Sequence, residues 1–130
     1  MMKKALMLFV LITLCIVHCT EEEEPLYCHV YGWVRTVSDS TGVNGLILKI
    51  IDLDPENLPE LRQRQVTTQT HDLLAGFFEI DSVVYGTDQR QGTAYVTFIA
   101  DSLDNPDWPH TVWNPNVYGD VDTTILYISQ

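Results

Sequence analysis

Residues 67–86, TTQTHDLLAGFFEIDSVVYG, constrain the fold of this chain more than any other stretch. Within them, residues 78–81 (FEID) alternate apolar and acidic side chains. A period of two is typical of a strand that buries one face and exposes the other to water. We therefore expect a strand over residues 77–84, entered through a turn that Gly76 closes.

The same alternation recurs along the rest of the chain. In residues 26–37 one predicted face is small and aliphatic and the other is aromatic and polar. Residues 43–53 are apolar on both faces except at Lys49, which favours a central strand of a sandwich. The two faces of residues 26–37 would consist of Cys28, Val30, Gly32 and Val34 on one side and His29, Tyr31, Trp33 and Arg35 on the other. Further extended segments are predicted at residues 66–70, 93–103 and 123–129.

Proline interrupts the pattern in two places. Residues 54–64 contain Pro55 and Pro59, which predicts a loop or a single helical turn, and residues 104–122 are expected to be irregular. No stretch of the mature chain has the pattern of a long helix. Six strand-like runs without such a helix predict an all-β fold, a single antiparallel β-sandwich of the transthyretin-like or immunoglobulin-like kind over residues 26–130.

The N-terminus has the pattern of a secretion signal. Lys3 and Lys4 precede an apolar run over residues 5–17. A membrane-spanning helix needs about 20 apolar residues, so this run is too short and fits the core of a signal peptide. We expect residues 1–18 to be a cleaved signal peptide, with an uncleaved membrane anchor as the alternative.

Cys19 follows the apolar run directly. Residues 16–19, Ile-Val-His-Cys, resemble the lipoprotein box of bacteria, in which the cysteine after the cleavage site carries the lipid. His18 departs from that pattern, because a small residue is expected before the cut. The resemblance implies a lipidated Cys19. The alternative is a secreted protein in which Cys19 forms a disulfide with Cys28, as an oxidising compartment would allow.

An acidic segment separates Cys19 from the predicted domain. Residues 19–25 include four successive glutamates, which repel one another and predict a solvated tether. They also resemble the acidic export signal of surface lipoproteins. Loss of residues 1–18 would remove two of the 7 Lys and Arg and none of the 18 Asp and Glu, so the formal charge would fall from −11 to −13. That charge opposes nucleic acid as a partner.

Several weak motifs together resemble the carboxypeptidase regulatory-like domain, a transthyretin-like sandwich. Val30, Gly32 and Val34 match its first strand, and Gly76 and Phe78 match its turn and following strand. The match spans roughly residues 28–100, and His71 stands where the family has an aspartate. The resemblance implies a non-catalytic accessory domain.

No pattern of catalytic residues appears, and no cofactor is expected. The histidines His18, His29, His71 and His110 are too far apart in the sequence for a shared metal site. Oxygen ligands suited to calcium come closest together at Asp101, Asp104 and Asp107, but the residue order of a calcium loop is absent. Asp and Asn also favour turns for backbone reasons, which is the alternative at these positions.

Three aromatic residues lie in the proline-rich segment: Trp108, Trp113 and Tyr118. Aromatic side chains on a loop can bind a partner or stack on a sugar ring. They can equally fold back and cover one open end of the sandwich. We single out this loop as the candidate binding surface.

Together these features predict a non-catalytic, lipid-anchored protein of the cell envelope, at the outer membrane or the cell surface. Its β-sandwich would have a structural role or bind a protein or a glycan. One alternative is a soluble secreted accessory or inhibitor domain with a Cys19–Cys28 disulfide, located in the periplasm or outside the cell. An enzyme whose active site the sequence does not reveal is a third.

Overall fold

The computed structural model describes residues 25–54, 58–87 and 95–130. The predicted signal peptide, Cys19 and nearly all of the acidic tether lie outside these residues. The described chain forms eight strands, β1 (Pro25–Thr36), β2 (Ile47–Asp54), β3 (Leu58–Thr67), β4 (Gln69–His71), β5 (Leu74–Thr87), β6 (Tyr95–Ala100), β7 (Thr111–Trp113) and β8 (Val121–Ile128). It contains no helix long and apolar enough to cross a membrane.

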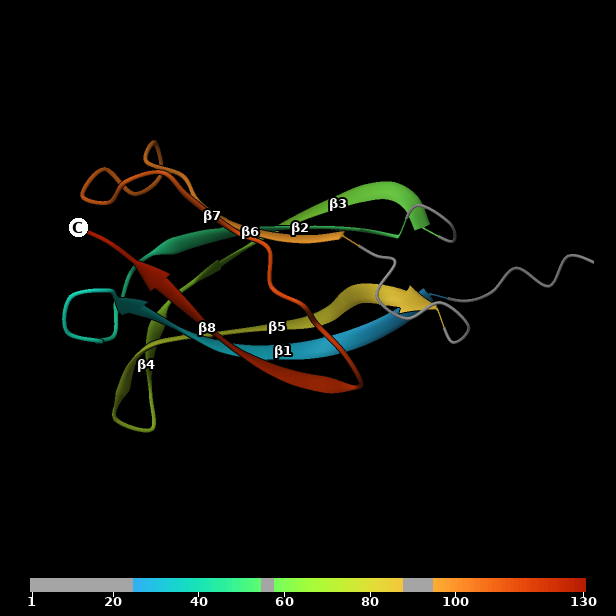
Figure 1. Cartoon of the computed structure of the whole chain (residues 1–130), viewed down its shortest axis with the longest axis horizontal. Helices are drawn as coiled ribbons and strands as arrows, with labels where there is room; N and C mark the ends of the chain where they lie inside the picture. Colours follow the sequence, from blue (N-terminus) through green and yellow to red (C-terminus); the bar gives the residue numbers. More distant parts are fainter. Residues whose placement is uncertain (1–24, 55–57, 88–94) are drawn as a thin grey trace, which may run out of the picture.

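The strands form two four-stranded sheets that pack as two layers (Figure 1). Sheet A has the order β4-β5-β1-β8, and sheet B has the order β3-β2-β6-β7. The prediction of a single all-β sandwich is thus confirmed. Five of the six described strand pairs are antiparallel, and the exception is β8, which runs parallel to β1.

The core lies between the inner faces of the sheets, where alternate apolar side chains of each strand meet. The rings of Phe78 on β5 and Phe98 on β6 join the two layers, with centroids 5.4 Å apart. Both side chains are almost fully buried. The predicted inner face of the first strand is confirmed, because its members Cys28, Val30, Gly32 and Val34 are all buried.

The prediction that Gly76 closes a turn is wrong. The hairpin between β4 and β5 turns at Asp72 and Leu73, whose φ angles of 48° and 67° are those that a two-residue hairpin requires. Gly76 instead lies inside β5 with a φ of 84°. A Cβ atom there would lie 2.3 Å from the carbonyl oxygen of Val34, so the neighbouring backbone requires a glycine.

The loop or helical turn predicted over residues 54–64 is also wrong in part. Residues from Leu58 onward belong to β3. Among the described strands, β3 is at the edge of sheet B and pairs only with β2. An edge strand tolerates a proline such as Pro59 because one side of its backbone needs no partner. Similarly, the segment predicted to be irregular before the last strand contains the short strand β7.

Candidate binding surface

The outer face of sheet A carries an aromatic row on β1. His29, Tyr31 and Trp33 alternate with the buried residues of that strand, so strand geometry turns them away from the core. All three are only half-buried. The rings of His29 and Tyr31 are close, with centroids 4.5 Å apart.

Strand pairing extends this row across the sheet. Trp33 lies opposite Phe77 of β5 on one side and opposite Ile125 of β8 on the other. The rings of Trp33 and Phe77 meet edge to face at 5.6 Å, and 45% of Ile125 is exposed. We call Phe77, Trp33 and Ile125 the sheet A stripe. The outer face of an antiparallel sandwich is ordinarily polar, so an apolar stripe across three strands marks a surface with a special role.

His71 of β4 covers one end of the stripe. Its ring stacks on that of Phe77 with centroids 4.4 Å apart and an interplanar angle of 22°. Phe77 is consequently only 4% exposed although it points away from the core. The indole Nε1 of Trp33 is also buried and has no hydrogen-bond partner among the described residues.

Polar groups border the aromatic row. His29 Nε2 lies 2.7 Å from Glu79 Oε1, and both side chains remain partly exposed. Beyond Tyr31, the register of β8 places Thr123 next to the row. The outer face of sheet A thus combines aromatic planes with hydrogen-bonding groups, the combination that binding sites use for affinity and orientation.

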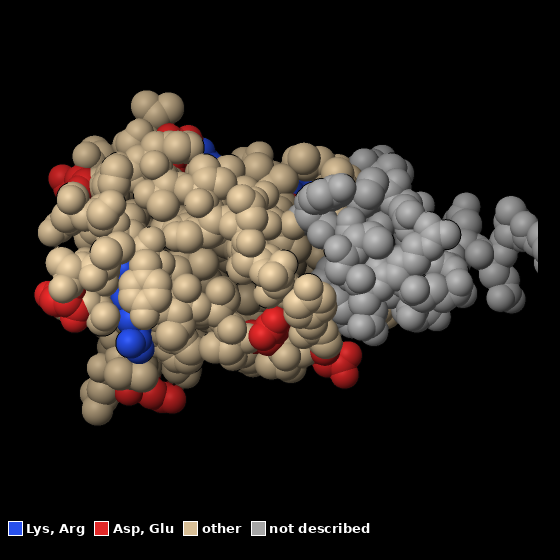
Figure 2. Space-filling model, in the orientation of Figure 1, with Lys and Arg blue, Asp and Glu red and all other residues tan. Residues whose placement is uncertain are grey.

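On the face of the molecule shown in Figure 2, charged side chains do not dominate as the composition would imply. In the view of Figure 2, most of the described surface carries neither acidic nor basic side chains. The acidic side chains that are visible lie mainly toward its margins. Uncharged surface of this kind is available for contacts in which apolar area is buried.

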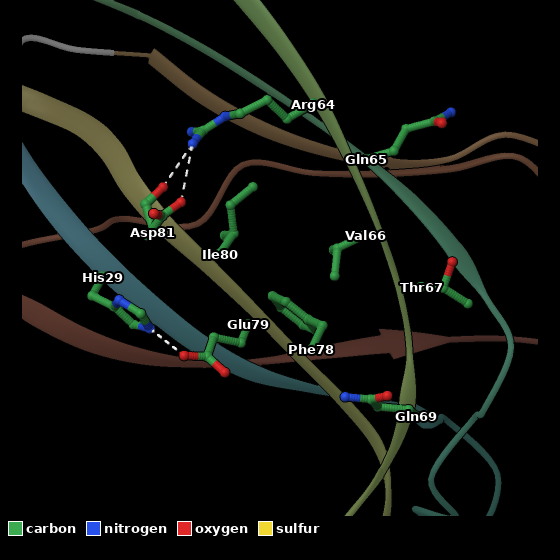
Figure 3. A pocket seen from close by; sticks show the side chains of 10 residues that line it. All are labelled: His29, Arg64, Gln65, Val66, Thr67, Gln69, Phe78, Glu79, Ile80 and Asp81. Atoms are coloured by element: carbon green, nitrogen blue, oxygen red, sulfur yellow. Dashed lines mark hydrogen bonds and ion pairs between the residues drawn. The ribbon is translucent and has the colours of Figure 1, made fainter.

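A groove lies on the flank of the sandwich between β3 and β5. It has a volume of about 580 Å³ and lies close to the pair formed by His29 and Glu79 (Figure 3). Val66 of β3 and Phe78 and Ile80 of β5 form its apolar part. We call this cavity the β3–β5 groove, and its lining consists of His29, Arg64, Gln65, Val66, Thr67, Gln69, Phe78, Glu79, Ile80 and Asp81.

A buried carboxylate joins the two sheets beside the groove. Asp52 of β2 is fully buried and binds Arg62 and Arg64 of β3. Its Oδ2 also accepts a hydrogen bond of 2.9 Å from the backbone N–H of Val84 in β5. The arginines in turn donate to backbone carbonyls of β5, with Arg64 Nη1 2.6 Å from the oxygen of Asp81. This Asp52 cluster, consisting of Asp52, Arg62 and Arg64, closes one end of the flank.

The loop aromatics singled out from the sequence do not form a common surface. Trp108 and Trp113 are half-buried and pack against the core. Trp113 Nε1 donates a 3.0 Å hydrogen bond to the carbonyl oxygen of Tyr127, which ties β7 to β8. Only Tyr118 is largely exposed, at 51%. Both tryptophans thus contribute to packing, and Trp113 does so from strand β7 rather than from a loop.

The three candidate calcium ligands do not form one site: Asp101 and Asp104 bind Lys49, and Asp107 takes no part in this contact. Lys49 Nζ lies 3.2 Å from Asp101 and 2.7 Å from Asp104, so an ammonium group neutralises both carboxylates. The hydrogen bonds to Asp104 and Asp101 raise the pKa of Lys49. A hydrogen bond from the backbone N–H of Leu103, followed by the contact with Lys49, lowers the pKa of Asp101. Asp107 is exposed, and the described residues contain no group of three or more metal ligands.

Cys28 is a free, fully buried thiol on the inner face of β1. Burial raises its pKa to about 11, and the nearby carboxylate of Asp122 adds to the shift. A thiol of this kind is unreactive and packs as a small apolar side chain. Its predicted alternative partner, Cys19, lies outside the described residues.

Sequence reasoning missed the sheet A stripe and the Asp52 cluster. The aromatic face of β1 was visible as alternation, but its neighbours Phe77 and Ile125 depend on strand order. Asp52 had a sequence signal, since an aspartate within an apolar run needs a buried partner and Arg62 and Arg64 share one face of β3.

No family model, curated protein or solved structure matches the chain. The resemblances to bacterial lipoproteins and to the carboxypeptidase regulatory-like domain therefore stay predictions.

Proposed function

We propose that this protein is a non-catalytic, lipid-anchored component of the cell envelope that binds a protein or a glycan through the outer face of sheet A. The observation that carries the proposal is the sheet A stripe, which aligns Phe77, Trp33 and Ile125 across three strands. His71 covers the Phe77 end of the stripe, whereas Trp33 is half-buried and 45% of Ile125 is exposed.

Exposed residues of β8 enlarge the apolar area next to the stripe. Val121 and Tyr127 are 61% and 47% exposed and share the outer face of this strand with Ile125. Removing apolar surface from water contributes about 25 cal/mol per Å² before the entropic cost of association is subtracted. His29 and Glu79, at the border, can orient a partner by hydrogen bonds.

The lipid anchor is supported by the order of segments. Cys19 follows the apolar run of the signal, and the folded domain begins at Pro25, so only a short acidic segment separates them. Cys28 faces the core with no exposed surface, which disfavours its use in a disulfide with a residue outside the fold. These two features favour lipidation of Cys19 over the soluble, disulfide-bonded alternative.

A matched pair of variants tests the binding surface. Ile125→Lys places a charge on the sheet A face, whereas Val112→Lys places one at a site on sheet B that is 47% exposed, close to the 45% of Ile125. The mature protein would be labelled and applied to a glycan array and to intact cells of its native type of host. Binding should be lost in the first variant and retained in the second. Equal binding by both variants would refute the assignment of the surface.

Intact mass spectrometry of the mature protein tests the anchor. A diacylated or triacylated N-terminal Cys19 is the expected result. An unmodified chain two hydrogens lighter than its reduced form would instead establish the Cys19–Cys28 disulfide and a secreted domain.

A further inference from the structure

Within the described residues, one part of the β5 edge has no partner strand. β4 pairs with β5 only at Gln69 opposite Phe77 and His71 opposite Leu74. β5 continues well beyond Phe77, to Thr87. Sheet A therefore has an incomplete edge, in which the short strand β4 covers only the first part of its neighbour.

The pairing pattern identifies the main-chain groups that face outward. The N–H of His29 donates to the carbonyl oxygen of Asp120, directly before β8, so the main-chain groups of the next residue of β1, Val30, face β5. Val30 lies opposite Ile80, and the main-chain groups of Glu79 consequently point away from β1. The next outward carbonyl, that of Asp81, is already taken by Arg64. Among the described residues, the N–H and C=O of Glu79 have no strand partner.

The β3–β5 groove lies along this gap. Glu79, Ile80 and Asp81 line it on one side and Gln65, Val66 and Thr67 on the other. Figure 3 shows Val66, Phe78 and Ile80 pointing into the space between the two strands. Its volume of about 580 Å³ lies within the range of pockets that hold a ligand. A strand added to β5 would direct one side chain toward these apolar residues.

The exposed charges at the groove are negative. Side-chain exposure is 47% for Glu79 and 79% for Asp81. The cation at the groove, Arg64, is only 27% exposed and is engaged by the buried Asp52. Together with the formal charge of −11 for the whole chain, this pattern favours a basic occupant.

We infer that the β3–β5 groove binds an extended, basic segment of a partner protein, which adds to sheet A as a strand on β5. The main-chain groups of Glu79 supply the pairing, and an aliphatic side chain of the partner contacts Val66 and Ile80. Lys or Arg next to that side chain contacts Glu79 or Asp81. This mode of recognition takes affinity from the main chain and specificity from alternate side chains. The groove shares His29 and Glu79 with the border of the aromatic row, but its apolar part contains no residue of the sheet A stripe.

The test is selection from a random-peptide display library on the mature full-length protein. We expect enrichment of peptides with an aliphatic residue flanked by Lys or Arg. Val66→Lys should weaken their binding by about tenfold or more, because it fills the apolar part of the groove. Since Val66 is half-buried, the double variant Glu79→Lys/Asp81→Lys provides an independent test at exposed sites and should also weaken them. Val112→Lys on sheet B should have no effect.

Two further measurements separate strand addition from other contacts. Hydrogen exchange followed by NMR should show slower exchange of the Glu79 amide in the complex. A peptide that is N-methylated at the residue opposite Glu79 should bind about tenfold or more weakly, because it lacks a main-chain donor. The inference would be overturned by selection without enrichment, by an acidic consensus, by equal binding of the methylated peptide, or by spectral changes centred on Trp33.

Discussion

Replacement of Asp52 by alanine tests the connection between the two sheets. Asp52 is fully buried, and its carboxylate receives hydrogen bonds from Arg62, from Arg64 and from the backbone N–H of Val84. These partners lie on β3 and β5, which belong to different sheets. Asp52→Ala therefore removes one group that holds the edges of both sheets together.

The size of the stability loss expected for Asp52→Ala depends on how deeply the groups that bind its carboxylate are buried. Val84 is fully buried, and leaving its N–H without an acceptor costs about 1–3 kcal/mol. Breaking a buried ion pair costs about 3–5 kcal/mol. The side chains of Arg62 and Arg64 are 28% and 27% exposed, so water can solvate part of both guanidinium groups once the carboxylate is removed. The expected loss of unfolding free energy therefore lies toward the lower end of the range for a buried ion pair. We expect the free energy of unfolding to fall by about 3 kcal/mol.

The assay is urea unfolding monitored by tryptophan fluorescence and by circular dichroism. Asp52→Asn keeps the shape of the side chain and one acceptor oxygen, so its free energy of unfolding should fall less than that of Asp52→Ala. The control is Asp81→Ala, because Asp81 is 79% exposed and lies 3.9 Å from Arg64. Its effect should stay within about 0.5 kcal/mol. A loss below about 1 kcal/mol for Asp52→Ala would refute the role of the cluster.

Three other predictions concern the core and the loops. Phe78→Ala should reduce the free energy of unfolding by about 3–5 kcal/mol in urea unfolding, since Phe78 is 1% exposed, and a loss typical of a surface site would contradict its position. Asn105→Ala should lower the free energy of unfolding by about 2–4 kcal/mol in the same assay, because the side-chain amide of Asn105 bonds both the N–H and the C=O of Ile47, at 2.7 and 2.9 Å. A variant as stable as the parent would show that water replaces the amide. Cys28 should resist a thiol reagent at pH 8 until urea unfolds the protein, because burial raises its pKa to about 11. The protonated thiol of Cys28 should contribute fully to the free energy of unfolding below pH 8.5–9, where the thiol of the unfolded chain titrates. This contribution should be lost as the pH rises toward 11, because the unfolded state releases the proton at a lower pH than the folded state does. A free energy of unfolding that stays constant over that pH range would contradict this.

The alternation of side chains allowed much of the fold to be predicted. The inner face of β1 and the buried positions of β6 follow directly from a period of two. This pattern is local, because successive residues of any strand point to opposite sides. An apolar run without alternation predicts a central strand within residues 43–53, and sheet B places β2 between β3 and β6.

Local reasoning failed where a special conformation depends on a distant neighbour. Glycine favours turns, so the sequence predicts a turn at Gly76, whereas its role depends on the approach of Val34 in another strand. Pro59 predicts an interruption of the strand pattern, although an edge position removes the need for its N–H. In both cases the conformation depends on whether another strand lies next to the residue, which the local sequence does not reveal.

The candidate binding surface likewise has a part that residue spacing predicts and a part that depends on strand order. The sequence by itself determined that His29, Tyr31 and Trp33 share the outer face of one strand, because that face follows from residue spacing. Only the tertiary structure decided that β1 lies between β5 and β8, which aligns Trp33 with Phe77 and Ile125. Strand order and register join residues far apart in the chain, and they depend on how whole faces pack rather than on any local pattern.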